Sequence, residues 1–150
     1  MLWANQTQFT AMTTTGTESA PRKIRTLIVD DQMLQREVLR MLLRREADIE
    51  IVGTSDNGRD AVASINELQP DLVFMDVQMP ELDGFGVVSE IGPARMPNFI
   101  FVTASDQAAK QARELNAVDF LLKPCTRDRF QIALQRARAK LQRLPATTTA

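Results

Sequence analysis

Apolar and polar residues follow two periodicities in turn along the chain. Short apolar runs, which are typical of buried strands, are each followed by a segment whose apolar residues recur every three or four positions, as on one face of a helix. The strand-like runs are 24–30, 49–55, 71–76, 98–104 and 118–123. The helix-like segments are 32–46, 58–68, 85–91, 106–116 and 126–144. This alternation predicts an α/β fold: a single doubly wound, five-stranded parallel sheet with helices on both faces.

Breaker and capping residues mark the expected ends of these helices. Pro70 stops the second helix, and Gly92 with Pro93 closes the third. Asp106 stands where it could accept a hydrogen bond at the start of the fourth helix, so we expect it to be the capping residue. The helical segments are therefore short and separated by sharp turns, as doubly wound folds require.

Three regions of different composition divide the chain. Residues 1–22 are rich in Thr, Gln, Ser and Ala without a sustained apolar period, and we expect them to form a flexible leader. Residues 23–144 carry all ten periodic segments and are expected to form one domain. Residues 145–150 are expected to be the start of a linker or a tail.

Composition excludes several classes of protein. The chain has 150 residues, of which 44% are hydrophobic, and this suits one domain with a single core. A net charge of −1 provides no overall attraction for nucleic acid or membranes. No apolar run reaches the length of about 18 residues that a transmembrane helix needs, and the N-terminal segment lacks the features of a secretory signal. The one cysteine, Cys125, has no internal disulfide partner, so we expect a cytoplasmic location.

The chain contains no histidine. This absence removes Ser-His-Asp and Cys-His catalysis and His-ligated zinc from the chemistry that this chain can perform alone. Any reaction must depend on carboxylates, hydroxyl groups, lysine and a hard metal ion.

Polar residues stand where four of the predicted strands end. They are Asp30 and Asp31, Asp76, Thr103 and Lys123, after the first, third, fourth and fifth strands respectively. If the strands are parallel, these residues share one edge of the sheet, where doubly wound folds bind ligands. Three carboxylates at one edge repel each other unless a cation joins them. A set of oxygen ligands without histidine or thiolate suits Mg²⁺.

This set of residues suits phosphoryl transfer. A carboxylate can attack phosphorus and form an aspartyl phosphate, while a metal ion and a lysine neutralise the charge. Asp76 is the best candidate for the nucleophile, and Asp30 and Asp31 are better placed to hold the metal. A single Asp at a strand end is usually a turn or cap residue. The joint occurrence, each residue at the end of its own strand, favours a functional site.

Four motifs contain these residues: "LIVDD" (27–31), "DLVFMDVQMPELDG" (71–84), "VTA" (102–104) and "FLLKP" (120–124). Together they resemble the receiver domain of bacterial two-component response regulators, and the resemblance covers about residues 23–144. It implies a flavodoxin-like fold with strand order 2-1-3-4-5 and five helices.

The resemblance implies specific roles at the acidic site. Asp76 is the phosphoacceptor and takes the phosphoryl group from the phosphohistidine of a sensor histidine kinase or phosphotransfer protein, or from a small donor such as acetyl phosphate. Mg²⁺ is held by Asp30, Asp31 and Asp76, with the backbone carbonyl of Gln78 as a further ligand. The domain is then a signalling switch and not an enzyme, apart from its own phosphorylation and dephosphorylation.

The resemblance also implies how phosphorylation is transmitted. Thr103 and Lys123 contact the phosphoryl oxygens, Thr103 moves toward them, and Phe120 turns into the vacated space. The face made by the fourth helix, the fifth strand and the fifth helix changes as a result, and a homodimer on this face is expected after phosphorylation. The family often has a cis peptide bond before the proline that matches Pro124.

The output of such a switch has two interpretations. The basic last helix resembles receivers that precede DNA-binding domains, so the chain would regulate transcription through an output domain outside this sequence. The alternative is a stand-alone receiver that acts in a phosphorelay or by protein–protein contact. Either reading involves nucleic acid only through another domain, and no membrane.

Two other classes that share parts of this pattern fit less well. A hydrolase of the haloacid dehalogenase type requires a second Asp two residues after the nucleophile, where this chain has Gln78. A flavodoxin-like nucleotide binder requires a phosphate-binding loop after the first strand, where Asp30 and Asp31 would repel the ligand.

Overall fold

Strands and helices alternate throughout residues 22–149, the part of the chain that the computed structural model describes, with side chains described as far as Gln142. The strands are β1 (Ile24–Val29), β2 (Ile49–Ser55), β3 (Leu72–Met75), β4 (Asn98–Thr103) and β5 (Asp119–Leu122). The helices are α2 (Met33–Arg44), α3 (Gly58–Leu68), α4 (Gly84–Ile91), α5 (Ala109–Glu114) and α6 (Arg127–Thr149). The predicted leader, residues 1–22, lies outside the described residues apart from Arg22.

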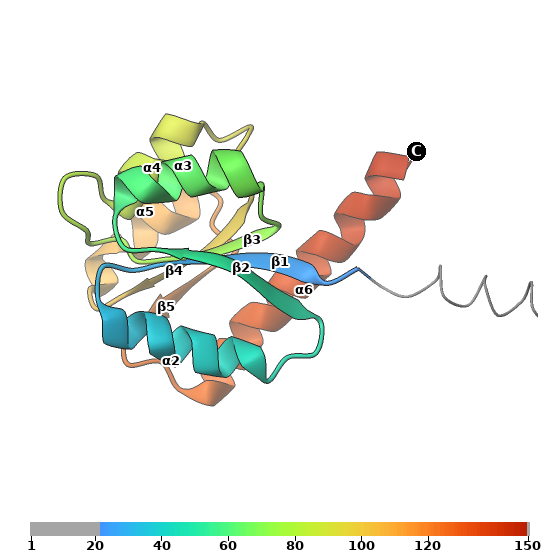
Figure 1. The fold of residues 1–150 in the computed structure, drawn as a ribbon, viewed down its shortest axis with the longest axis horizontal. Coiled ribbons are helices and arrows are strands. Elements are labelled where there is room, and N and C mark those ends of the chain that lie inside the picture. The colour runs from blue at the N-terminus through green and yellow to red at the C-terminus, as the bar shows by residue number, and fades with distance from the viewer. Residues whose placement is uncertain (1–21, 150) are drawn as a thin grey trace, which may run out of the picture.

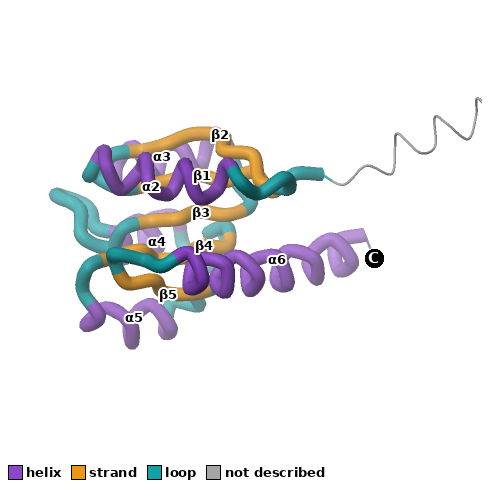
Figure 2. The backbone as a smooth tube through the Cα atoms, turned by 90° about the horizontal axis from the view of Figure 1, so that it is seen from below, coloured by secondary structure: helices purple, strands orange, loops and turns teal. Residues whose placement is uncertain are grey.

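The five strands form one parallel sheet in the order β2-β1-β3-β4-β5. Helices α3, α4 and α5 cover one face of the sheet, and α2 and α6 cover the other (Figures 1 and 2). The predicted doubly wound α/β fold and its strand order are confirmed. Because β1 and β3 are neighbours although β2 lies between them in sequence, the chain reverses its direction of winding between these two strands.

The central strand β3 shows why apolar runs form the middle of this sheet. All four of its side chains are fully buried, since helices cover both faces. Val73 and Met75 point into the core under α3, α4 and α5, whereas Leu72 and Phe74 point into the core under α2 and α6. The ring of Phe74 stacks on Phe130 of α6, with centroids 5.6 Å apart. The two-residue alternation of a strand therefore supplies both cores at once.

Most predicted helix ends agree with the structure to within two residues. Helix α3 ends at Leu68, and Gln69 adopts a left-handed conformation (φ 47°), so the helix stops before Pro70. Helix α4 ends at Ile91, and the next residue, Gly92, has a φ of 94°, which suits a residue without a side chain.

Two features of the later helices differ from the predictions. The predicted cap Asp106 is wrong: Ser105 caps the segment, and its hydroxyl oxygen accepts a hydrogen bond from the Gln107 N–H at 3.3 Å. The reason is that the chain first forms a 3-10 turn, η1 (Asp106–Ala108). Because Asp106 is the first residue of this turn, the capping position is the residue before it, Ser105. Helix α6 continues past Leu144 and through Pro145 to Thr149.

Ion pairs fasten α6 to the rest of the domain. Arg129 donates two hydrogen bonds to the carboxylate of Asp119 in β5, at 2.8 and 2.9 Å, and Arg136 lies 3.0 Å from the same carboxylate. Further along α6, Arg138 donates to Glu46 and Asp48 in the loop before β2, each at 2.8 Å. We call these two groups the α6 network. The second group connects segments that are about 90 residues apart in sequence.

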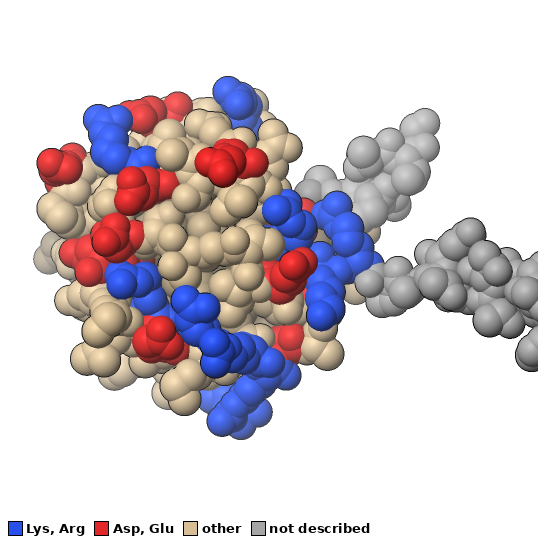
Figure 3. Space-filling view, viewed as in Figure 1, with Lys and Arg blue, Asp and Glu red and all other residues tan. Residues whose placement is uncertain are grey.

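Charges of both signs are interspersed over the visible surface, with Lys and Arg gathered along the edge where α2 lies (Figure 3). Helix α2 itself contains three arginines: Arg36, Arg40 and Arg44. Within residues 22–149, no helix combines the length and the apolar character that crossing a membrane requires.

Candidate functional site

The candidate functional residues gather where β1 and β3 end, at the carboxyl edge of the sheet. Asp30 follows the last residue of β1, and Asp76 follows the last residue of β3. The Asp76 N–H donates to the carbonyl of Val29 at 2.9 Å, which extends the pairing of the two strands by one residue. The strand order thus places the two acids side by side, as the sequence predicted.

Three carboxylates form a cluster at this point: Asp30, Asp31 and Asp76. One oxygen from each lies within 4.8 Å of the others, while Asp31 is exposed and the other two residues are buried. Such a cluster is electrostatically unfavourable by itself, since like charges at this separation repel.

Lys123 supplies a positive charge to the buried pair. Its Nζ lies 2.8 Å from Asp30 Oδ2 and 3.2 Å from Asp76 Oδ2, and its side chain is only 10% exposed. The residue follows β5, where its N–H donates to the carbonyl of Thr103 at 2.8 Å. The peptide bond to Pro124 is cis, as the resemblance implied. Lys123 therefore reaches past β4 to the acids, and the predicted convergence of lysine and carboxylates is present.

The carboxyl group of Asp76 is held in place but only partly neutralised. Its Oδ1 accepts a hydrogen bond from the Gln78 N–H at 3.1 Å, and its Oδ2 faces Lys123. Burial raises the pKa of Asp76, the charge of Lys123 opposes that rise, and the negative charge of Asp30 adds to it. The charged form of Asp76 is thus less favourable here than in water.

The donor set fits a hard divalent cation. Asp30 Oδ1 accepts a hydrogen bond from the Gln32 N–H at 2.9 Å, and its buried Oδ2 forms an ion pair with Lys123 Nζ at 2.8 Å. The three clustered carboxylates still outnumber this one ammonium group, so they carry an excess of negative charge that a cation would neutralise. Oxygen ligands from three carboxylates match the preference of Mg²⁺.

The remaining predicted residues are Thr103, Phe120 and Gln78, of which Gln78 contacts Asp76 through its backbone N–H. Thr103, the last residue of β4, is fully buried, and its hydroxyl oxygen accepts a long hydrogen bond of 3.5 Å from the Ser105 N–H. Phe120 is half-buried and packs against the core under α3, α4 and α5, opposite Phe101 of β4. The side chain of Gln78 is exposed.

The sequence reasoning missed two residues that shape the site. A side chain at Gly84 would place its Cβ 2.6 Å from the carbonyl oxygen of Asp76, so only glycine lets α4 begin so close to the acid. Its position in the turn after Asp76 was a usable signal. Arg36 donates through Nη1 to the carbonyl of Asp30 at 2.7 Å, and the spacing of the α2 arginines gave no reason to select it.

Comparisons with known proteins agree with this architecture. The family model of the response regulator receiver domain matches residues 26–135. The transcriptional regulatory protein BtsR of Salmonella typhi is 44% identical over 115 residues, which cover 77% of this chain and 48% of that protein. The chain thus spans about half the length of the curated relatives it matches.

Solved structures show the same likeness. The response regulatory domain of protein mrkE from Klebsiella pneumoniae has a TM-score of 0.73 and 30% identity, over 79% of this chain and 98% of that one. The CheX-CheY-BeF3-Mg²⁺ complex from Borrelia burgdorferi has a TM-score of 0.69 and 26% identity, over 80% of this chain and 90% of that one.

Proposed function

This chain belongs to the family of response regulator receiver domains, and on that premise we propose that it accepts a phosphoryl group on Asp76 in a reaction that depends on Mg²⁺. The donor is the phosphohistidine of a sensor histidine kinase or of a phosphotransfer protein, or a small acyl phosphate. One observation carries the proposal: Lys123 pairs with two buried acids, Asp30 and Asp76, and a third carboxylate, Asp31, clusters with them.

The chemistry follows from the positions of these groups. An oxygen of the Asp76 carboxylate forms a bond to phosphorus while the bond from phosphorus to the donor nitrogen or oxygen breaks, and the donor leaves with that electron pair. Mg²⁺ held by Asp30, Asp31, Asp76 and the carbonyl of Gln78 would neutralise the phosphoryl oxygens. Lys123 gives up part of its pairing with the acids to contact the new phosphate.

The switch would act through β4 and β5. The hydroxyl group of Thr103, held now by one long hydrogen bond, can turn toward the phosphoryl oxygens at little cost. Phe120 is only partly buried in the same layer of the sheet, and it would move into the space that Thr103 leaves. We propose that this shift alters the face made by α5, β5 and α6, where a second phosphorylated copy binds.

The output is proposed from the relatives. BtsR is a transcriptional regulatory protein, and this chain matches about half of it. We therefore propose that the domain works in the cytoplasm and controls transcription through a DNA-binding domain outside this sequence. A stand-alone receiver in a phosphorelay is the alternative, and the coding sequence beyond Ala150 would decide between them.

The test is phosphorylation by acetyl phosphate. With Mg²⁺ present, intact-protein mass spectrometry should show one added phosphate that hydroxylamine removes, and Asp76→Asn should show none. Asp56→Asn is the matched control, because Asp56 follows β2 as Asp76 follows β3, and it should be labelled at the wild-type rate. Labelling of Asp76→Asn at that rate would disprove the assignment of the nucleophile.

Cation binding is measured separately by calorimetry. Asp31→Asn should weaken Mg²⁺ binding, because it removes one of three clustered carboxylates without disturbing a described hydrogen bond. An unchanged affinity would count against the acidic pair as the cation site.

A further inference from the structure

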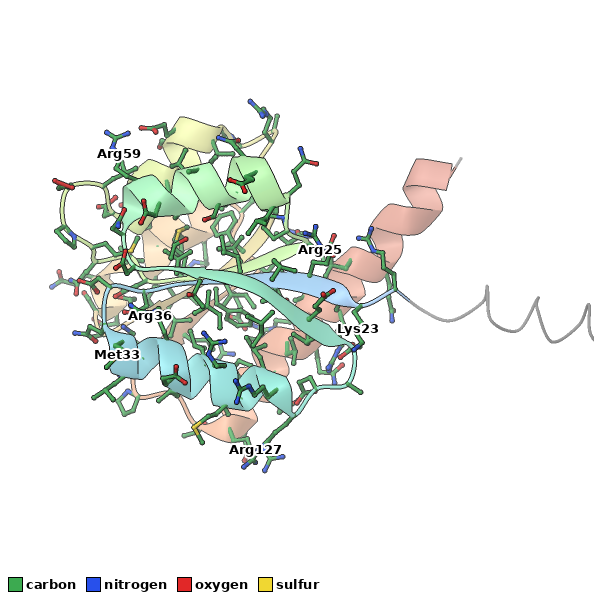
Figure 4. The ribbon with its side chains drawn as sticks, in the orientation of Figure 1. Lys23, Arg25, Met33, Arg36, Arg59 and Arg127 are labelled. Carbon is green, nitrogen blue, oxygen red and sulfur yellow. The ribbon has the colours of Figure 1, made fainter. Side chains whose placement is uncertain are left out.

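Arg36 connects α2 to the acidic site. It lies on the side of α2 that faces the sheet, close to the turn that follows β1 (Figure 4). Its guanidinium Nη1 donates a hydrogen bond of 2.7 Å to the carbonyl oxygen of Asp30, and the contact is partly buried. In contrast, Arg40, one turn further along, forms its ion pair within its own helix, with Glu37 at 3.6 Å.

Asp30 begins the turn between β1 and α2, and contacts from several elements hold it. Its N–H donates to the carbonyl of Ser55 at 3.1 Å, and its carboxylate accepts from the Gln32 N–H and pairs with Lys123. Its carbonyl lies beyond the strand register, which ends at Val29, and accepts the hydrogen bond from Arg36. Helix α2 begins after Gln32, whose side chain makes no capping hydrogen bond. The bond from Arg36 thus ties the first turn of α2 to the backbone of Asp30.

We propose that Arg36 is a positioning residue for the cation site: it holds the backbone of Asp30 and so aims the carboxylates of Asp30 and Asp31 at the metal. This inference rests on the proposed function, since it concerns the same site. The arrangement matches the general behaviour of metal centres, in which mutation of a group that orients a ligand typically weakens metal binding about 10- to 100-fold.

The charge of Arg36 makes the inference easy to test, because position and charge predict opposite results. A cation near a Mg²⁺ site repels the metal, so removing its charge should strengthen binding if electrostatics alone matter. If Arg36 positions the ligands, the same substitution should weaken binding.

The experiment compares Arg36→Gln, Arg36→Lys and the control Arg40→Gln by calorimetric titration of the purified chain with MgCl₂. We expect Arg36→Gln to weaken Mg²⁺ binding about tenfold or more. Arg36→Lys keeps a charged donor on a long side chain and should lie between Arg36→Gln and wild type, and Arg40→Gln should match wild type. Tighter or unchanged binding by Arg36→Gln would overturn the inference.

A measurement without metal separates this inference from the proposed function. The Gln32 N–H donates to Asp30 Oδ1, so its hydrogen exchange reports on the turn itself. In EDTA, Arg36→Gln should increase that exchange rate on the order of tenfold, while Arg40→Gln leaves it unchanged. If wild type failed to bind Mg²⁺, the proposed cation site would be wrong. The exchange rate would still show whether Arg36 holds the turn, and an unchanged rate in Arg36→Gln would refute that role.

Discussion

The acidic site and the α6 network each contain a buried carboxylate, and these two carboxylates behave in opposite ways. Asp76 in the acidic site and Asp119 in the α6 network each have a side chain that is only 6% exposed. The pKa of Asp76 is raised, first by burial and then by Asp30, against the opposing charge of Lys123. Burial also acts to raise the pKa of Asp119, but hydrogen bonds from Arg129 and from the Phe120 N–H outweigh it, so that pKa is lowered.

The two side chains are equally exposed, but their pKa values shift in opposite directions. The hydrogen-bond and ion-pair partners of each carboxylate therefore decide the direction of its pKa shift. Asp119 has two arginines and a backbone N–H for its two oxygens, so its charge is fully paired. In the acidic site, three acids share one lysine. The paired group stabilises the fold, whereas the incompletely paired group keeps an excess of negative charge that a cation would neutralise.

The same substitution in both groups should therefore have opposite effects on stability. In EDTA, Asp119→Asn should lower the free energy of unfolding by about 2 kcal/mol, because hydrogen bonds to charged groups contribute about 1.5–3 kcal/mol and the exposed arginines can regain water. Asp76→Asn should raise the free energy of unfolding, because it removes a repulsive charge while Lys123 keeps its contact with Asp30. Equilibrium unfolding in urea measures both.

The cation provides the control for this pair of variants. Adding Mg²⁺ should stabilise wild type, since a ligand that binds the native state shifts the unfolding equilibrium, and should stabilise Asp76→Asn less. Asp119→Asn should gain as much as wild type. If both Asn variants lost similar stability in EDTA, the distinction between a paired and an incompletely paired group would be wrong.

Acid should weaken the α6 network selectively. The folded-state pKa of Asp119 lies below its unfolded value, so the unfolded chain takes up more protons as the pH falls. The stabilisation from the charged Asp119 is therefore complete above the unfolded pKa. It is lost as the pH falls through the folded pKa. Glu46 and Asp48 shift in the same direction, through hydrogen bonds from Arg138.

Consequently, the difference in unfolding free energy between wild type and Asp119→Asn should shrink between about pH 6 and about pH 3. Urea unfolding in EDTA across this range measures it. A constant difference would mean that Asp119 stabilises the domain by shape and not by charge.

The contrast also explains which features the sequence could predict. The acidic site depends on residues at strand ends, and strand ends are visible as the limits of apolar runs, so Asp30, Asp76 and Lys123 could be placed from the alternation alone. The fold and strand order followed from the same alternation together with the motifs.

The α6 network could not be found this way. Arg138 reaches Asp48 across 90 positions of sequence, and only the packing of α6 beside the loop before β2 brings them together. The charges of α6 were interpreted as a basic face, although Arg129 and Arg138 point to acids of the domain itself. The cap at Ser105 and the role of Arg36 were missed for a similar reason, because each depends on a local backbone path that composition does not reveal.

The smallest expected effect belongs to a third kind of pair, which is exposed. Arg59 of α3 lies 3.0 Å from Glu90 of α4, with side chains 65% and 42% exposed, and Figure 4 shows Arg59 at the outer surface of its helix. A double-mutant cycle with Arg59→Gln and Glu90→Gln should give a coupling energy below about 0.5 kcal/mol, because water already solvates both charges. The corresponding cycle for Asp119→Asn and Arg129→Gln should give a clearly larger value, since one partner is buried. Similar coupling energies in the two cycles would mean that burial does not strengthen the pairing of Asp119. The α6 network would then differ from the acidic site only because its charges are paired.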